Sequence, residues 1–104
     1  MYSTELKSWG EAVRARDGQC FLCGATDHLN AHHILPKKVW PKHRLDLDNG
    51  ITLCIKCHLF GRYSVHRGIG SFLLYEKLQE ERPEQFNYVM QAIHNDERKT
   101  KLRE

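Results

Sequence analysis

Residues 48–58 read Asp-Asn-Gly-Ile-Thr-Leu-Cys-Ile-Lys-Cys-His and contain a cysteine pair with the spacing Cys-x-x-Cys. An earlier pair of the same spacing, Cys20-Phe-Leu-Cys23, is separated from it by 30 residues. Each pair offers two thiolates on one tight turn, and four thiolates complete the tetrahedral shell that zinc prefers. We therefore expect a structural zinc ion held by Cys20, Cys23, Cys54 and Cys57, with two disulfides as the alternative.

The size of the chain makes such a staple useful. Its 104 residues, 40% of them hydrophobic and 28% charged, fit one small domain spanning residues 1–104, whose core is only marginally stable by itself. No apolar run exceeds four residues, so we expect no membrane span. The chain opens without a secretory leader, which favours reduced cysteines and a cytoplasmic setting.

The positive charge is concentrated in the part of the chain that holds the cysteines. The net charge is +3, and residues 1–70 carry ten Lys or Arg against six Asp or Glu. Residues 71–104 carry six against seven. This asymmetry points to a polyanionic partner near the cysteines, although a net charge this small does not establish one.

The pattern around the cysteines predicts short elements of both kinds. Apolar residues at helical spacing predict a helix that starts near Ser3 or Ser8, the latter in a capping box with Glu11, and ends at Asp17-Gly18. We expect strands at 31–35 and 50–53, joined by a long loop over 36–49. The second cysteine pair should open a short helix that ends near Gly61.

The remaining residues, about 71–98, predict a helical extension. Ser71 is a candidate cap for a helix through about Glu80, and Pro83 fits the first turn of another. The second helix places a set of apolar residues on one face, namely Phe86, Val89, Met90 and Ile93. The charged tail from Asn95 is expected to fray.

Histidines are the second unusual feature, with seven in the chain. His32 and His33 are adjacent on the first expected strand, where neighbouring side chains point to opposite sides. One of them can face a metal ion shared with His58, while the other faces a reaction partner. From the residues alone, packing or an unrelated metal site is an equal alternative.

The order of these residues resembles the zinc-knuckle branch of the HNH endonucleases, within the His-Me finger class. The resemblance covers about residues 9–67 and rests on Cys20-x-x-Cys23, on Ala-His-His-Ile-x-Pro at 31–36, and on the run 48–58. It implies an α+β fold with a small ββα-metal core. The signature residues would be His33, Asn49 and His58.

The resemblance also implies roles for these residues. His33 would be the general base that activates water, Asn49 would tie the loop and help to orient the base, and His58 would bind a divalent cation. The family commonly has an acidic metal ligand just before the base, whereas this chain has His32. Because histidine is a softer ligand than carboxylate, Mn²⁺, Ni²⁺, Co²⁺ or Zn²⁺ should support activity better than Mg²⁺.

Other residues complete the expected site. His66 is a candidate third ligand, as in similar phage-type sequences, with a loop histidine as the alternative. A set of cations should bind the DNA backbone: Lys37, Lys38, Lys42, Arg44, Arg62 and Arg67. Trp40 either stacks on a base or packs in the core. His28, His43 and His94 are expected to be surface or loop residues.

The expected function is metal-dependent cleavage of one or both strands of DNA. The expected setting is the cytoplasm of a bacterial or phage-infected cell. A non-catalytic zinc-finger DNA-binding module is the alternative, but such a module does not need His33, Asn49 and His58 together. A redox role for the cysteine pairs is disfavoured because no thioredoxin-like strand pattern accompanies them. A monomer and a homodimer are equally compatible with the sequence.

Overall fold

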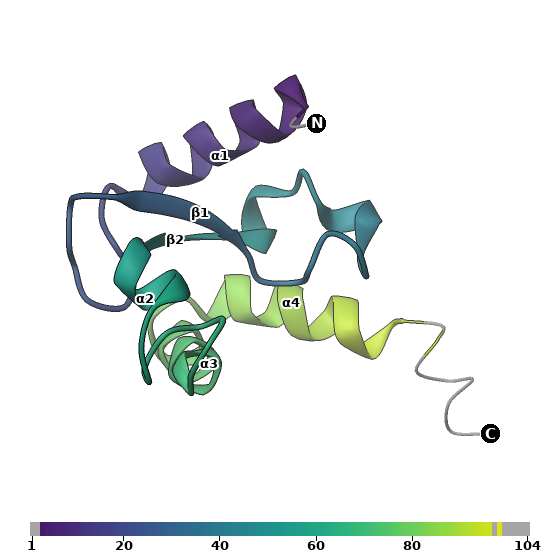
Figure 1. The fold of residues 1–104 in the computed structure, drawn as a ribbon. Coiled ribbons are helices and arrows are strands. Elements are labelled where there is room, and N and C mark those ends of the chain that lie inside the picture. The colour runs from purple at the N-terminus through teal and green to yellow at the C-terminus, as the bar shows by residue number, and fades with distance from the viewer. Residues whose placement is uncertain (1–2, 97, 99–104) are drawn as a thin grey trace.

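The computed structural model describes residues 3–96 and 98 (Figure 1). Its first element is α1 (Thr4–Asp17), which begins at Ser3, whose hydroxyl accepts a hydrogen bond from the Leu6 amide. The Ser8 capping box is therefore wrong, and the Ser3 start is confirmed. Gly18 ends the helix at a φ of 70°, a left-handed conformation that glycine adopts without a steric penalty.

Two antiparallel strands follow, β1 (Leu29–His33) and β2 (Gly50–Cys54). Leu29 pairs with Cys54 and His33 with Gly50. The first strand thus begins and ends two residues earlier than the expected 31–35. The pairing with Cys54 is the reason, since the start of β1 is set by its partner strand and not by its own alternation of side chains.

The long connection between the strands is ordered by two short 3-10 helices, η1 (Pro41–His43) and η2 (Leu47–Asn49). After β2 the chain enters α2 (Ile55–Leu59), the short helix expected after the second cysteine pair. The arrangement β1, β2, α2 confirms the small α+β fold with a ββα core.

The C-terminal part forms α3 (Gly70–Glu81) and α4 (Pro83–His94), with a proline in the first turn of α4 as expected. Ser71 does not cap α3: the helix begins one residue earlier, and its capping position, Ile69, makes no side-chain hydrogen bond. The charged tail lies largely outside the described residues.

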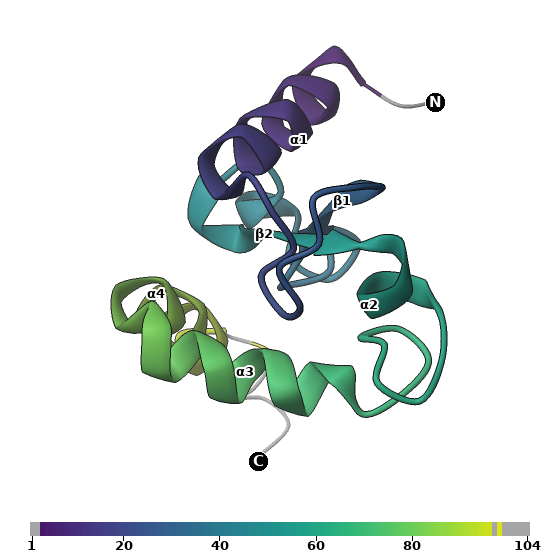
Figure 2. The ribbon, with the colours of Figure 1, turned by 90° about the vertical axis from the view of Figure 1, so that its left-hand side faces the viewer.

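The sheet lies between two layers of helices. Figure 1 shows α1 on one side of the strands and α4 on the other, and Figure 2 shows α3 and α4 together on that second side. Every residue of β2 is buried, because its two faces meet different helices. The hydrophobic core lies between the sheet and the C-terminal helices, and its buried residues include Ile51, Leu53, Leu74, Leu78 and Val89.

Asp17 links the two layers across the end of the sheet. Its carboxylate accepts a hydrogen bond from the Thr52 amide at 2.9 Å and pairs with Arg82, before α4, at 2.9 Å.

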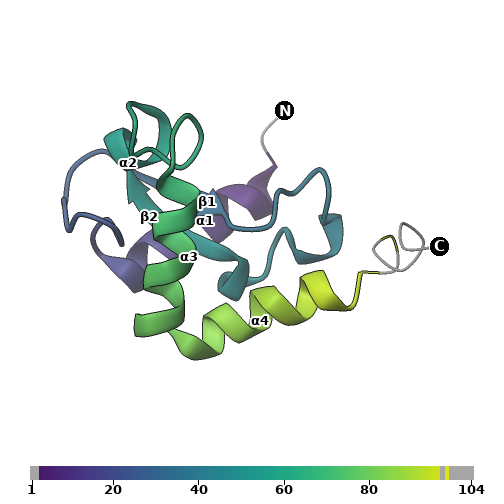
Figure 3. The same ribbon diagram turned by 90° about the horizontal axis from the view of Figure 1, so that it is seen from below.

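Figure 3 shows the same layers from the side of α3 and α4. Among the described residues, no helix has the length and apolar character that crossing a membrane requires.

Candidate metal centre and active site

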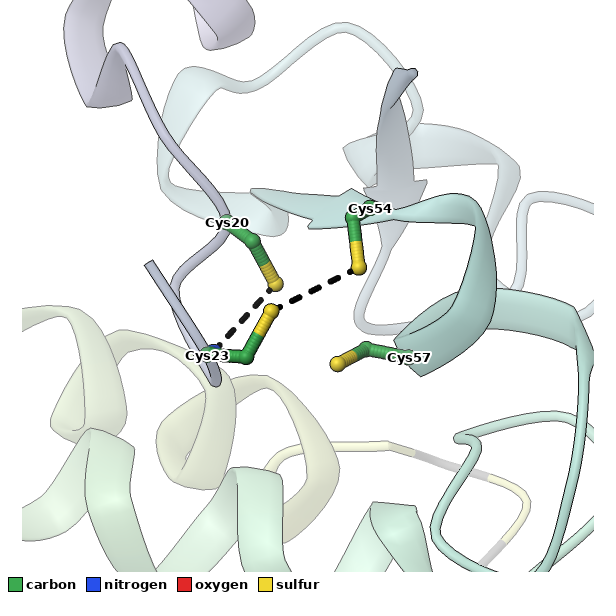
Figure 4. Close-up of side chains that lie close together, drawn as sticks. All are labelled: Cys20, Cys23, Cys54 and Cys57. Carbon is green, nitrogen blue, oxygen red and sulfur yellow. Dashed lines mark hydrogen bonds between the residues drawn. The ribbon is translucent and has the colours of Figure 1, made fainter. Parts of the chain in front are cut away.

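The four cysteines meet where the turn after α1 approaches the end of β2 (Figure 4). Their sulfur atoms all lie within 4.8 Å of one another, and the Cys23 and Cys54 sulfurs are 3.6 Å apart. A disulfide requires about 2.0 Å between sulfurs, and all four thiols are free, so the disulfide alternative is wrong for this structure. The cluster can hold a structural zinc ion, as predicted.

The thiols of this cluster differ in acidity. Burial opposes ionisation of the Cys20 thiol, but hydrogen bonds from the backbone of Cys54 and Cys23 outweigh it and lower its pKa to about 7. Burial raises the pKa of Cys57, and the neighbouring Cys54 and Cys23 add to the effect. Because neighbouring thiols oppose the ionisation of Cys57, four thiolates can coexist here only with a cation that balances their charge, as in a metal site.

Three histidines form a second cluster: His32 on β1, His58 on α2, and His66 in the loop before α3. One ring nitrogen from each lies within 4.8 Å of the others, and the Nε2 atoms of His58 and His66 are 3.0 Å apart. Two nitrogens bound to one ion at about 2.1 Å each lie about 3.0 Å apart when they meet at a right angle. The spacing therefore fits a shared divalent cation.

His66 reaches this cluster because its loop is tied to α2. The His66 amide donates to the His58 carbonyl at 3.1 Å, and the Val65 amide donates to the Cys57 carbonyl at 2.7 Å. Within the loop, the buried Ser64 hydroxyl donates to the Gly61 carbonyl at 2.9 Å and accepts from the Arg67 amide at 3.1 Å. Local backbone contacts thus hold His66, the candidate third ligand, beside His58.

His32 and His58, the two less exposed histidines of the cluster, are neutral at pH 7. Burial, reinforced by the nearby His58 and His66, lowers the pKa of His32 to about 3, and burial together with His66 lowers the pKa of His58 to about 4. A neutral imidazole has a free lone pair for a metal ion, whereas a protonated one has none. The cluster is therefore in the form that binds a cation.

Asn30 is a member of the site that sequence reasoning missed. Its side-chain oxygen accepts a hydrogen bond from Nδ1 of His58 at 3.2 Å, so the Nε2 lone pair of His58 faces His66. A signal was available, because Asn30 lies two residues before His32 and strand residues at that spacing share a face.

His33, the expected base, is hydrogen-bonded on one nitrogen. Its Nε2–H donates to the Arg44 carbonyl at 2.9 Å, so in the neutral ring Nδ1 carries the lone pair. Burial lowers the pKa of His33. His33 also lines an open pocket of about 610 Å³ together with His32, His58, His66, Lys37 and Lys38.

Asn49 is fully buried and closes the loop between the strands. Its amide oxygen accepts from the Leu35 amide at 2.7 Å, and its amide nitrogen donates to the carbonyls of Leu35 at 3.1 Å and His43 at 3.0 Å. One side chain thus connects both ends of the loop that carries Arg44. This geometry agrees with the loop-tying role inferred for Asn49.

The six expected DNA-binding cations are all exposed, but they do not all lie at the histidine pocket. Lys37 and Lys38 border the histidine pocket, and Arg62 and Arg67 belong to the His66 loop. Lys42 instead lines a separate pocket between the strand-connecting loop and α4. Within residues 3–96 and 98, none of the six forms an ion pair with a carboxylate.

The remaining candidates have structural surroundings. Trp40 is half-buried and packs against the core, which confirms the packing alternative. His43, in the loop as expected, makes contacts that the sequence did not indicate: its Nδ1 lies 2.8 Å from the Tyr88 hydroxyl and 3.1 Å from an Asp46 carboxylate oxygen. His28 and His94 are exposed.

One continuous segment, residues 20–59, contains both cysteine pairs as well as His33, Asn49 and His58, and this segment matches a known protein family. Residues 20–59 match the HNH endonuclease family. Separate searches of curated proteins and of solved structures gave no significant match. The HNH segment, as we call residues 20–59, contains β1, β2, α2 and the four cysteines, which confirms the resemblance to the zinc-knuckle branch.

The family match covers only some of the elements that surround the histidine cluster. The HNH segment includes His32, His33, Asn49 and His58, but His66 and the helices α1, α3 and α4 lie outside it. The match covers residues 20–59, which is less than half of the 104 residues.

Proposed function

We propose that this protein is a metal-dependent HNH endonuclease that hydrolyses phosphodiester bonds in DNA. The observation that carries the proposal is the pocket in which three histidine ligands, a hydrogen-bonded histidine and two lysines come together. A zinc-binding module without activity needs the four cysteines, but it has no use for a second cluster of neutral imidazoles beside them. The proposed catalytic residues are His33, Asn49 and His58.

The surface around the pocket suits a polyphosphate chain. Lys37 and Lys38 line the pocket, and Arg62 and Arg67 are exposed residues of the loop that carries His66. Flexible cations contact phosphates with little regard to base sequence, so these residues would bring the DNA backbone to the histidines. Lys42 and Arg44 would extend the contact along the strand-connecting loop.

In the proposed reaction, Nδ1 of His33 takes a proton from a water molecule whose oxygen attacks the phosphorus. The bond from phosphorus to the 3′ oxygen breaks, and that oxygen leaves with a proton from solvent, giving 5′-phosphate and 3′-hydroxyl ends. A divalent cation held by His32, His58 and His66 would supply Lewis acidity, stabilising the negative charge of the phosphate and of the leaving oxygen. Asn49 holds the loop whose Arg44 carbonyl orients His33.

The ligand set predicts the choice of metal. Three imidazoles without a carboxylate are a poor match for Mg²⁺, which prefers oxygen ligands, and a better match for Mn²⁺, Ni²⁺, Co²⁺ or Zn²⁺. The cysteine cluster would keep zinc as a separate, structural ion.

A supercoiled-plasmid assay across Mg²⁺, Mn²⁺, Ni²⁺, Co²⁺ and Zn²⁺, with EDTA as control, tests the proposal. We expect nicked or linear DNA with at least one of the softer ions, weaker cleavage with Mg²⁺, and none with EDTA. Binding of DNA without cleavage in any metal would contradict the proposal and favour the zinc-finger DNA-binding module. The ratio of nicked to linear product also reports whether one strand or both are cut.

The proposed setting is the cytoplasm of a bacterial or phage-infected cell.

A further inference from the structure

Trp9, which lies on α1 outside the HNH segment, covers one face of His33. The two rings are 3.9 Å apart between centroids and 8° from parallel. Only 5% of the Trp9 residue is exposed. A buried, parallel neighbour restricts rotation of the imidazole, because turning the ring would remove the stacking and press its edge into the indole.

The same indole also holds the loop that bonds to His33. Its Nε1–H donates to the Asp46 carbonyl at 2.9 Å. Asp46 lies two residues after Arg44, the residue whose carbonyl accepts from His33. On the other side of Arg44, the His43 carbonyl accepts from Asn49 at 3.0 Å. Hydrogen bonds to two different side chains therefore fix the backbone on both sides of the acceptor.

We propose that Trp9 is a positioning residue for His33. It sets the plane of the imidazole by stacking, and it sets the acceptor for Nε2–H by holding Asp46. Nδ1 is then the nitrogen left to take a proton, and no hydrogen bond engages it within the described part of the chain. The inference rests on the proposed function, in which His33 is the base, and it extends the site to a helix that the family match does not include.

A purely structural role is the competing explanation, because Trp9 also fills space against β2. A Cβ atom added to Gly50 would lie 2.7 Å from Cζ2 of Trp9, so the indole and this strand are in close contact. The test must therefore separate the indole N–H from the bulk of the ring.

Trp9→Phe makes that separation, because it keeps a buried aromatic ring and removes the N–H. Trp40→Phe is the matched control: the Trp40 Nε1–H is also buried but has no hydrogen-bond partner among the described residues. We expect Trp9→Phe to lower kcat by about tenfold or more, the scale on which small misplacements affect catalysis. We expect KM for DNA to stay within about twofold, because the groups that bind phosphate are unchanged.

The ¹⁵N chemical shifts of His33 give a second reading that does not depend on cleavage. The zinc-loaded wild type and Trp40→Phe should show the Nε2–H tautomer, and Trp9→Phe should show a mixture of both tautomers. Wild-type His33 in the Nδ1–H form, or a Trp9→Phe protein with the kcat and tautomer of Trp40→Phe, would overturn the inference.

The two readings separate this inference from the proposed function. If the wild type does not cleave DNA with any metal, the proposed function fails, and the tautomer comparison alone decides whether Trp9 positions His33. If the wild type cleaves but Trp9→Phe matches Trp40→Phe in both readings, the proposed function stands and the positioning role fails.

Discussion

At the scale of single residues, the side-chain amide of Asn30 selects which nitrogen of His58 carries a proton. The amide oxygen accepts from Nδ1, which leaves Nε2 as the lone pair directed towards His66. Hydrogen bonds of this kind fix the tautomer of a metal-binding histidine and raise its affinity for the ion. Asn30 would therefore influence a cation at this cluster through His58, without being one of its ligands.

We predict that Asn30→Leu weakens Mn²⁺ or Co²⁺ binding by about ten- to a hundredfold, the usual cost of losing a partner that orients a metal ligand. Isothermal titration calorimetry of the zinc-loaded protein measures the affinity. Asn87→Leu, at an exposed position of α4, is the control. Unchanged affinity in Asn30→Leu would show that His58 does not need this hydrogen bond.

The pH profile of cleavage reports on His33. Its pKa is lowered from the ordinary 6.5, mainly by burial, and the neutral ring is the form that can accept a proton. The rate should therefore stay level as the pH falls towards 6.5 and decline only below it. Measurements of kcat at saturating metal and DNA test this. A rising limb centred above about pH 7 would exclude a buried imidazole as the base.

At the scale of elements, the loop between α2 and α3 turns so tightly that side chains are excluded from it. A Cβ atom on Gly68 would collide with the backbone carbonyl of Arg62, and one on Gly70 would collide with that of Tyr63. These contacts return the chain towards α2 and bring His66 to His58. The position of His66, the proposed third ligand, therefore depends on two glycines that are not members of the histidine cluster.

We predict that Gly68→Ala displaces His66 and weakens cation binding at the histidine cluster by at least about tenfold, while the cysteine site keeps its zinc. Tyr63→Ala, which changes an exposed residue of the same loop, should leave both sites intact. Metal analysis together with calorimetry distinguishes the two sites. Loss of both metals in Gly68→Ala would indicate general unfolding instead of a local effect.

The sequence predicted elements where local chemistry determines them. Ser3, Gly18 and Pro83 mark helix ends through their own side chains or backbone, and the sequence located two of the three helix boundaries and offered Ser3 as one of two starts. Ser71 failed as a cap because the chain enters α3 from a loop packed by backbone contacts, so the helix starts without a side-chain bond. The predicted ends of the first strand were also wrong, because the pairing of Leu29 with Cys54 sets where that strand begins.

The site was predictable to the extent that spacing carries it. The four cysteines and His32, His58 and His66 come together as the motif implied. The contact of Trp9 with His33 and the ion pair of Asp17 with Arg82 were not predictable, because each joins segments whose relative positions depend on the packed fold. Long-range contacts of this kind leave no periodic trace in the sequence.

At the scale of the whole molecule, the cysteine cluster connects the end of α1 to the end of the sheet. Cys20 and Cys54 are buried members of the same core as Leu74, Leu78 and Val89. A zinc ion bound there would tie together the two ends of the HNH segment, against which the C-terminal helices pack. Because a metal site of this type forms only on folding, its binding free energy adds to stability.

We predict that removing zinc with a strong chelator lowers the melting temperature by at least about 10 °C, which corresponds to about 2 kcal/mol for a domain of this size. Cys57→Ser should show a similar loss, whereas His66→Ala should not. Circular dichroism during heating measures both. A melting temperature that is unaffected by zinc removal would mean that the core is stable without the metal.

Nicking of supercoiled plasmid by His33→Ala tests the central claim most directly, with His94→Ala as the control at an exposed histidine. In the metal that best supports the wild type, we expect His94→Ala to cut normally. His33→Ala should lose at least about a hundredfold in rate, the lower end of what a general base contributes, while it retains zinc and DNA affinity. Cleavage by His33→Ala at a rate close to that of the wild type would contradict the account.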